Sequence, residues 1–352
     1  MFLLLIMNNM KKLFTFLILL SALTACGPKE KEFTVLQWNI WQEGTVIPGG
    51  YEAIVNEIVR LRPDFVTLSE VRNYQNTDFT ARLVQSLQEK GETYYSFYSY
   101  DTGLLSRYPI TDSLTVFPEN NDHGSIYRLT ADMNGRKVAV YTAHLDYLDD
   151  AYYNVRGYDG SIWKEIPIPT RVEEVLERNA ASRRDDAIRL FIAQAEKDRA
   201  AGYTVILGGD FNEPSHRDWT EETKNLYDHH GLVIPWTVTV LLEEAGWKDA
   251  YREHYPDVLK YPGFTYPSDN PAKPAEDITW APKADERDRI DYIWYYPEKG
   301  LKVKDAAVFG PKGSIVRSQR VQETSQDKFI EPINVWPTDH KGVWVTFTYT
   351  AD

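Results

Sequence analysis

The sequence predicts an α/β domain that contains more than one β-sheet. Strand-like apolar runs and amphipathic helical segments alternate irregularly along the chain, which is typical of such a domain. The 43% apolar and 13% aromatic content is enough for a large core. No Ser/Gly-rich or Pro-rich linker divides the middle of the 352 residues, so we expect residues 33–350 to form a single domain.

The first 26 residues are predicted to be a leader and not part of the fold. From Met10 the sequence reads "MKKLFTFLILLSALTAC", which is two lysines, a short apolar run and a small-residue cleavage region. The "LTAC" ending at Cys26 resembles a bacterial lipobox, so we expect Cys26 to be lipidated, with residues 27–32 as a tether. The protein would then be exported and held at a membrane, on the periplasmic or cell-surface side. The alternative is an ordinary signal peptide that ends near a cysteine.

The elements of the first half follow in order. A strand is predicted at "EFTVLQWNIW", and a helix in "YEAIVNEIVRLRPDFV" has Ile54, Ile58 and Leu61 on one face and ends before Pro63. "DFVTLSEV" is predicted to be a buried strand. A second helix follows with Phe79, Leu83 and Leu87 and is capped by Gly91.

The second half continues the pattern. Strands are predicted at "TGLLSRYPI" and "RKVAVYTAHLDY", and one long helix from about Val172 to Ala200 leads into the strand "YTVILGGDFN". A short helix is expected at 237–245, before the final strands "RIDYIWYY" and "KGVWVTFTYT".

Polar residues lie at or near the ends of many of these strands. Functional groups of open α/β sheets collect at strand ends, so we expect a shared site there. The residues are Asn39, Glu70, His144, Asp210, Asn212, Asp291, Asp339 and His340.

If these carboxylates converge, they need a compensating cation. Two carboxylates about 4 Å apart repel by roughly 4 kcal/mol at an effective dielectric near 20. Oxygen ligands suit Mg²⁺, Mn²⁺ or Ca²⁺, whereas the absence of cysteine after Cys26 argues against structural zinc. The two histidines add proton donors or acceptors that work near neutral pH. Together these groups describe metal-assisted phosphoester hydrolysis.

Seven motifs in order resemble the endonuclease/exonuclease/phosphatase superfamily, whose members include deoxyribonuclease-I-like enzymes. They are "LQWNIW", "DFVTLSEV", "TGLLSRYPI", "AHLD", "GGDFNEP", "RIDYIWY" and "PTDHKGVW", and they span Phe33 to Tyr349. The resemblance implies a four-layer sandwich of two mixed β-sheets flanked by helices, with the site at one end.

The resemblance also implies roles for individual residues. Glu70 would be the principal metal ligand, with Asn39 nearby and Asp339 as a further ligand or partner of the metal. Asp210 would position or deprotonate the attacking water, and Asn212 would hold that water or a phosphate oxygen. His340, polarised by Asp291, would contact the scissile phosphate. His144 would donate a proton from the opposite side.

Several residues have structural alternatives. Either of His144 and His340 could be a core histidine, and Asp291 could form a structural ion pair with Arg289. Arg128 is either a phosphate contact or an ordinary surface charge. Ser106 and Arg107 are expected to shape a turn. The remaining histidines are expected on the surface or in loops: His123, His216, His229, His230 and His254.

A long segment without clear periodicity, residues 146–170, follows His144. Its aromatic content argues against disorder, so we expect it to overhang the site as a recognition loop; the alternative is a flap that covers a sheet edge. Its candidates for substrate contacts are Tyr147, Tyr152, Tyr153, Arg156, Tyr158, Trp163 and Lys164. A second segment, residues 261–288, is also rich in Pro and aromatics, and such rings suit a sugar or a nucleobase.

The sequence therefore predicts a divalent-metal phosphoesterase that acts on a small or medium phosphorylated substrate, such as a phosphosugar, a nucleotide or a lipid headgroup. The formal net charge of −13 argues mildly against a dedicated nucleic-acid binder, and removal of the leader would make it more negative. Two alternatives stay open, an extracellular DNA or RNA nuclease and a non-catalytic surface binding protein. No protein partner is predicted.

Overall fold

The computed structural model describes residues 30–118 and 123–350, and within these ranges the chain forms two six-stranded β-sheets. The first sheet has the strand order β13-β10-β14-β1-β2-β3, and the second has the order β4-β5-β6-β7-β9-β8. Both sheets are mixed, since β1–β2, β10–β13 and β6–β7 are parallel pairs among antiparallel ones. The strands are β1 (Glu30–Asn39), β2 (Phe65–Val71), β3 (Asp101–Ser106), β4 (Ile110–Phe117), β5 (Gly124–Met133), β6 (Arg136–Leu145), β7 (Thr204–Asp210), β8 (Lys248–Asp249), β9 (Asp291–Tyr295), β10 (Lys302–Phe309), β13 (Phe329–Ile330) and β14 (Gly342–Thr350), with a separate hairpin β11 (Gly313–Val316) and β12 (Gln319–Gln322).

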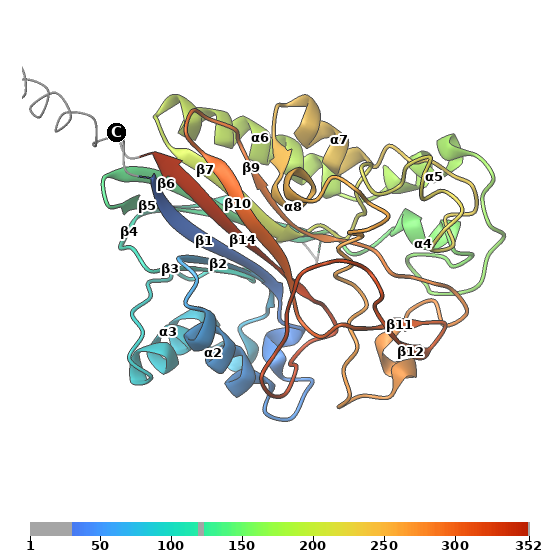
Figure 1. The fold of residues 1–352 in the computed structure, drawn as a ribbon, viewed down its shortest axis with the longest axis horizontal. Helices are drawn as coiled ribbons and strands as arrows, with labels where there is room; N and C mark the ends of the chain where they lie inside the picture. The colour runs from blue at the N-terminus through green and yellow to red at the C-terminus, as the bar shows by residue number, and fades with distance from the viewer. Residues whose placement is uncertain (1–29, 119–122, 351–352) are drawn as a thin grey trace, which may run out of the picture.

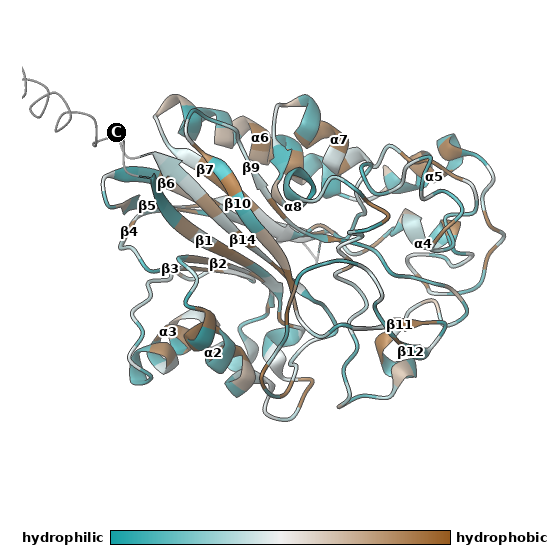
Figure 2. Ribbon diagram, viewed as in Figure 1, coloured by the Kyte–Doolittle hydropathy of each residue, from teal (hydrophilic) through white to brown (hydrophobic). Residues whose placement is uncertain are grey.

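Helices cover the outer faces of both sheets. In Figure 1, α2 (Gly50–Leu61) and α3 (Phe79–Glu89) lie below the strands, and α6 (Arg184–Ala200) and α7 (Thr237–Glu244) lie above them. Their ribbons carry both apolar and polar residues (Figure 2), as expected for helices that cover a sheet with one face. On α6, for example, Phe191 packs edge-on against Tyr141 of β6 at 4.9 Å. The predicted arrangement of two mixed sheets flanked by helices is confirmed.

The two inner faces are apolar toward one end of the sandwich and polar toward the other. Phe33, Val345 and Ile293 belong to the large apolar cluster between the sheets. Toward the opposite end the sheets exchange hydrogen bonds, such as Ser69 Oγ to Ala143 O (3.2 Å). Buried polar groups need such partners.

Strand register gathers polar residues at this polar end. In the second sheet His144 of β6 pairs with Asp210 of β7, and Asp210 pairs with Asp291 of β9. In the first sheet Asn39 of β1 lies opposite Ser69, one residue before Glu70. The predicted convergence of these strand ends is therefore confirmed.

Several elements differ from the sequence prediction, which did not include β4, β10 or the hairpin β11–β12. The predicted long helix is broken into α5 (Val172–Asn179) and α6, because Asn179 and Arg184 turn inward and bond to each other (3.0 Å). Strand β1 begins at Glu30, inside the predicted tether, since its first residues pair with β14. The segment 146–170 contains a short helix, α4 (Ala151–Val155), where none was predicted.

The predicted leader and the lipidation of Cys26 lie outside the described residues. Within 30–118 and 123–350, none of the helices has the length and apolar composition required to cross a bilayer.

A buried arginine ties the segment 146–170 to the turn after β7. Arg184 donates to Asp150 Oδ1 (2.7 Å) and to Asp146 O (2.6 Å), and it lies 3.6 Å from Glu213 Oε2. Glu213 also accepts a hydrogen bond from Val238 N at the start of α7 (2.7 Å). One side chain thus fixes three segments around the same end of the sandwich.

We expect Arg184→Met to lower the free energy of unfolding by about 3–5 kcal/mol, because it leaves Asp150 and Glu213 buried without their cation. Arg189→Met is the matched control, since Arg189 lies on the same helix and its ion pair with Asp185 is exposed. Urea unfolding of both variants measures the difference. Equal stabilities would contradict the structural role of Arg184.

His229, predicted to be a surface or loop residue, lies in a loop but is buried and stacked on Trp219 with ring centroids 3.6 Å apart. Burial, with a smaller contribution from the nearby Arg156, lowers the pKa of His229 to about 2. The folded state therefore holds this ring neutral. Between pH 6.5 and 2 the unfolded chain binds a proton that the folded chain refuses, so stability is full above pH 6.5 and declines as the pH falls.

Between pH 7 and pH 5 the wild-type protein should lose about 2 kcal/mol more stability than His229→Phe, which has no titrating ring. His230→Asn serves as the control because His230 is exposed. Denaturant titrations at the two pH values test this. The same pH dependence in wild type and His229→Phe would show that His229 does not remain neutral.

Candidate active site

A cavity of about 270 Å³ opens where the polar ends of the two sheets meet. Its wall is formed by residues from both sheets and from the segments that follow β6 and precede β9. The lining residues are Trp41, Gln42, Glu70, Arg72, His144, Tyr147, Asp150, Tyr152, Tyr153, Trp163, Asp210, Asn212, Tyr266, Trp280, Ile290, Asp339 and His340. Six of the eight polar residues expected at strand ends line this cavity. The other two lie directly behind the lining: Asn39 donates to Glu70, and Asp291 bonds to His340.

His340 forms a buried pair with Asp291. The distance between His340 Nδ1 and Asp291 Oδ2 is 2.9 Å, so the other ring nitrogen faces the cavity, 3.8 Å from Asp210 Oδ2. Burial alone would favour the neutral ring, but Asp291 and Asp210 outweigh it and raise the pKa of His340 to about 10. Asp291 is not paired with Arg289, whose guanidinium bonds to Asp218 and Asp249.

His144 is held in the same way by an aspartate that the sequence analysis did not identify. Asp101, at the start of β3, lies 2.9 Å from His144 Nδ1 and 3.0 Å from Arg72 Nη1. Burial opposes the charge on His144, but Asp101 and then Asp210 raise the pKa of His144 to about 9. A polar residue directly before the buried run "TGLLS" was the available signal, because the same criterion selected the other site residues.

Asp210 and Asn212 are presented by the turn that ends β7. Asn212 adopts a left-handed φ of 48°, its backbone N–H donates to Asp210 Oδ1 (3.0 Å), and its Nδ2 donates to Leu145 O (3.0 Å). Burial and the neighbouring Asp291 raise the pKa of Asp210 to about 6. Asp210 is therefore a stronger base than an ordinary aspartate, yet it is still charged near pH 7.

Glu70 and Asp339 approach the cavity from the first sheet and from the turn before β14. Glu70 has a left-handed φ of 66° at a register shift in β2, which turns its side chain toward the site, and its Oε2 accepts a hydrogen bond from Gln42 N (2.9 Å). Asp339 accepts a 3.4 Å hydrogen bond from Thr338 Oγ1. Burial, and then the charge of Glu70, raise the pKa of Asp339 to about 7.

This donor set fits a hard divalent cation. Burial and the charge of Glu70 raise the pKa of Asp339, and a cation held by both carboxylates would offset their repulsion. Ligand atoms of Asp210, Asp291 and His340 also lie within 4.8 Å of one another. Because Asp291 already engages His340 Nδ1, we expect Glu70 and Asp339 to hold a cation and His340 and Asp291 to act as a proton-holding pair.

Asn39 contacts two carboxylates of this site through its amide nitrogen. Its Nδ2 donates to Glu70 Oε1 (3.0 Å) and to Asp210 Oδ2 (2.8 Å), while its Oδ1 accepts from Trp41 N (2.9 Å). Asn39 therefore lies beside Glu70 as predicted, where its amide nitrogen orients the two carboxylates; its role toward a metal stays a prediction.

Two predicted substrate contacts are wrong. Arg128 is buried between β5 and α6, where it bonds to Asp198 and Asp112, so it is neither at the cavity nor an ordinary surface charge. Arg156 is fully engaged in the interior, with Nη1 2.7 Å from Asp288 Oδ2 and Nε donating to Asp285 O (2.7 Å). The sequence alone does not predict that an arginine will form an ion pair with a particular buried carboxylate.

The aromatic wall matches the prediction for the segment 146–170 and extends it. Tyr153 and Trp163 line the cavity as expected, and Trp163 stacks on Trp280 of the second irregular segment with centroids 4.8 Å apart. Tyr266, which was not singled out, packs against His340 at 4.9 Å. The segment also packs on Trp219 and Trp236, so it forms part of the core as well as the wall. Tyr147 and Tyr152 reach the cavity, whereas Tyr158 lies in that core and Lys164 is exposed.

Comparison with known proteins agrees with this fold. A family model described as "Endonuclease/Exonuclease/phosphatase family" matches residues 36–340. The uncharacterized protein F14F9.5 of Caenorhabditis elegans is 26% identical over 319 residues, which cover 90% of this chain and 91% of that protein. The solved structure of D. rerio TDP2 complexed with single strand DNA product has a TM-score of 0.50 at 17% identity and covers 90% of this chain and 99% of its own. Truncated Caenorhabditis elegans TDP2 also has a TM-score of 0.50, at 18% identity, over 91% and 98% of the two chains. These two structures share the fold.

Glu70→Gln and Asp339→Asn should abolish or strongly weaken binding of Mn²⁺ by the purified protein, because each removes a charged oxygen ligand. Asn39→Ala should weaken it about 10–100-fold through loss of ligand orientation. Isothermal calorimetry measures all three. Glu331→Gln is the control because it alters an exposed ion pair with Lys312. Unchanged affinity in both carboxylate variants would exclude the assigned cation site.

Proposed function

This chain belongs to the endonuclease/exonuclease/phosphatase family, and from that premise we propose that it is a divalent-metal-dependent phosphoesterase that cleaves a small or medium phosphorylated substrate. The observation that carries the proposal is the convergence of Glu70, Asp339, Asp210 and two Asp-paired histidines on one cavity. Family membership supports a hydrolase, and the donor set supports Mg²⁺, Mn²⁺ or Ca²⁺ as the cofactor.

We propose a separate task for each group around the scissile phosphate. Asp210, with its raised pKa, accepts a proton from the attacking water, and Asn212 holds that water or a phosphate oxygen. His340 is charged near pH 7 and binds a phosphate oxygen, while Asp291 fixes its orientation. His144, charged through Asp101, donates a proton to the departing oxygen. A bound divalent cation would supply charge stabilisation and lower the pKa of the water.

The second candidate is an extracellular nuclease. D. rerio TDP2 was solved with a single strand DNA product, and this chain shares its fold. Against this reading, Arg72 is the one Lys or Arg among the lining residues of the cavity in the described ranges, and the chain carries a net charge of −13. Binding of nucleic acid normally depends on several phosphate-contacting cations. The small-substrate reading is therefore favoured.

The proposed location follows from the leader. Export and anchorage through Cys26 would place the enzyme on the outer side of a membrane, where a phosphorylated substrate from the surroundings could reach it. Two assays in the native host would test the anchor: whether globomycin blocks processing of the leader, and whether a fatty-acid analogue labels the protein. The Cys26→Ser variant is the control and should not be labelled.

The purified Gly27–Asp352 fragment, with Mg²⁺ or Mn²⁺, should hydrolyse a 4-nitrophenyl phosphoester. Asp210→Asn and His340→Ala should each lower kcat by about 10²–10⁴-fold, because they remove the base and the phosphate contact. His216→Ala is the matched control, since His216 is bonded to Thr239 and Glu243 away from the cavity. Wild-type rates in both site variants would refute the assignment.

Plasmid DNA and single-stranded oligonucleotides should be poor substrates for the same preparation, because the described lining offers few phosphate-binding cations. Gel assays at matched enzyme and metal concentrations measure this. Degradation of DNA with an efficiency equal to that of the small ester would instead establish the nuclease.

A further inference from the structure

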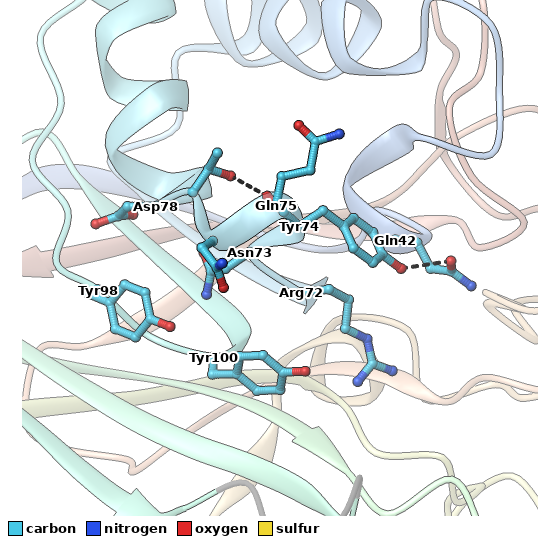
Figure 3. Close-up of a pocket in the computed structure, with 10 residues that line it drawn as sticks. Gln42, Arg72, Asn73, Tyr74, Gln75, Asp78, Tyr98 and Tyr100 are labelled. Carbon is cyan, nitrogen blue, oxygen red and sulfur yellow. Dashed lines mark hydrogen bonds between the residues drawn. The ribbon is translucent and has the colours of Figure 1, made fainter.

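We propose that the substrate is a phosphodiester whose second esterified group, a neutral hydroxyl-rich group such as a sugar or polyol, binds in a polar groove next to the catalytic cavity. This inference rests on the proposed phosphoesterase function. The groove is a separate hollow of about 870 Å³, and it shares Gln42 and Arg72 with the wall of the catalytic cavity. Its lining consists of Gln42, Arg72, Asn73, Tyr74, Gln75, Asn76, Thr77, Asp78, Tyr98 and Tyr100 (Figure 3).

The lining offers hydrogen-bonding groups and rings with little net charge. It combines amide side chains with three tyrosines, and the rings of Tyr98 and Tyr74 are 59% and 39% exposed. Hydroxyl groups of a sugar can both donate to and accept from amides and phenols, and sugar rings pack on aromatic faces. A neutral polyhydroxylated group therefore satisfies this surface.

The charged residues of the groove already have partners. Arg72 is paired with Asp101, and Asp78 caps α3 by accepting from Ala81 N (3.0 Å). A polyanion would require additional cations, whereas Arg72 is the one Lys or Arg among the lining residues of the described ranges. The chemistry of the groove thus favours a neutral group over a nucleic-acid backbone.

The groove is preorganised by a buried side chain. Asn73 is 7% exposed, its Nδ2 donates to Ser99 O (2.8 Å), and its Oδ1 accepts from Phe79 N (3.0 Å). Its backbone N–H donates to the buried Glu43 Oε1 (2.5 Å). Three segments are thereby fixed around the hollow, so little ordering is needed when a ligand binds.

The wall of the groove is connected to the catalytic centre. Tyr74 Oη donates to Gln42 Oε1 (2.8 Å), as Figure 3 shows. Gln42 N in turn donates to Glu70 Oε2 (2.9 Å), the carboxylate expected to hold the cation. A group held in the groove therefore lies beside the reacting phosphate and not at a distant surface.

The two hollows provide one binding site for each side of a phosphodiester. The aromatic wall with Trp163 and Trp280 would hold one ester group, and the polar groove would hold the other, with the phosphate between them at Glu70, Asp210 and His340. Water oxygen would bond to phosphorus as one P–O ester bond breaks. One water proton passes to the departing alcohol oxygen by way of the site groups, which leaves an alcohol and a phosphomonoester. A monoester would leave one hollow without an occupant.

Three 4-nitrophenyl diesters of equal reactivity test this: glucose 6-(4-nitrophenyl phosphate), 4-nitrophenyl methyl phosphate and thymidine 5′-(4-nitrophenyl phosphate), with 4-nitrophenyl phosphate as the monoester. We expect kcat/KM for the glucosyl diester to exceed that of each other compound by at least tenfold. Tyr98→Ala should raise KM for the glucosyl diester at least tenfold more than KM for the methyl diester, with similar kcat. Tyr95→Ala, an equally simple truncation of a tyrosine that is 39% exposed and outside the groove, should change neither.

Each contrary outcome has a distinct meaning. Preference for the monoester would overturn the diester inference while keeping the phosphoesterase. Preference for the thymidine diester that depends on Tyr98 would replace the sugar with a nucleoside. If no ester is cleaved with any metal, the proposed function fails. Calorimetric titration of wild type and Tyr98→Ala with the intact glucosyl diester then decides the groove separately, and equal or absent binding in both would overturn it.

Discussion

The close approach of the two sheets at one end of the sandwich is the constraint on which the site depends. Gly208 of β7 faces Thr67 of β2, and any Cβ at position 208 would overlap the threonine hydroxyl. A Cβ on Gly209 would lie 2.6 Å from Ala143 O. Since position 208 must be free of a side chain, Gly208 allows strands from different sheets to end next to one another, while Gly209 allows β7 to lie close to its neighbour β6 within the second sheet. Asp210, the next residue, is thereby carried between the sheets and reaches groups from both.

That proximity creates an excess of buried negative charge, and the structure compensates it in two ways. His144 and His340 each bind an aspartate through Nδ1 and direct the other nitrogen toward Asp210. Asn39 spans the carboxylates of Glu70 and Asp210 with a single amide. Burial, and then the charge of Glu70, still raise the pKa of Asp339, and a divalent cation would stabilise the charged form of this carboxylate. The buried carboxylates destabilise the folded state, but the same carboxylates and histidines are the groups that could bind a metal and a phosphate together.

The irregular segments around this centre have a different role from the sheets, because they shape the binding surfaces on either side of it. Arg184 and Glu213 fix the aromatic segment 146–170 over the cavity, and Glu43 and Asn73 fix the polar groove beside it. The sheets determine which bond can be attacked, whereas these segments determine the shape and polarity of the groups on either side. Glu213, which follows the catalytic turn, illustrates the division because its carboxylate serves packing and not chemistry.

The sequence by itself determined most of the long strands and helices and the family motifs, because these depend on local periodicity and on residues at strand ends, and the resemblance built on those motifs implied the pairing of His340 with Asp291. Tertiary structure alone decided the rest. Asp101 reaches His144 across sequence-distant strands, and Arg128 and Arg156 turn inward to carboxylates far along the chain. The partner of a buried charged side chain is set by tertiary packing, so the local sequence does not predict which residue it will be. For the same reason the polar groove became visible only when three separate turns were placed around Asn73.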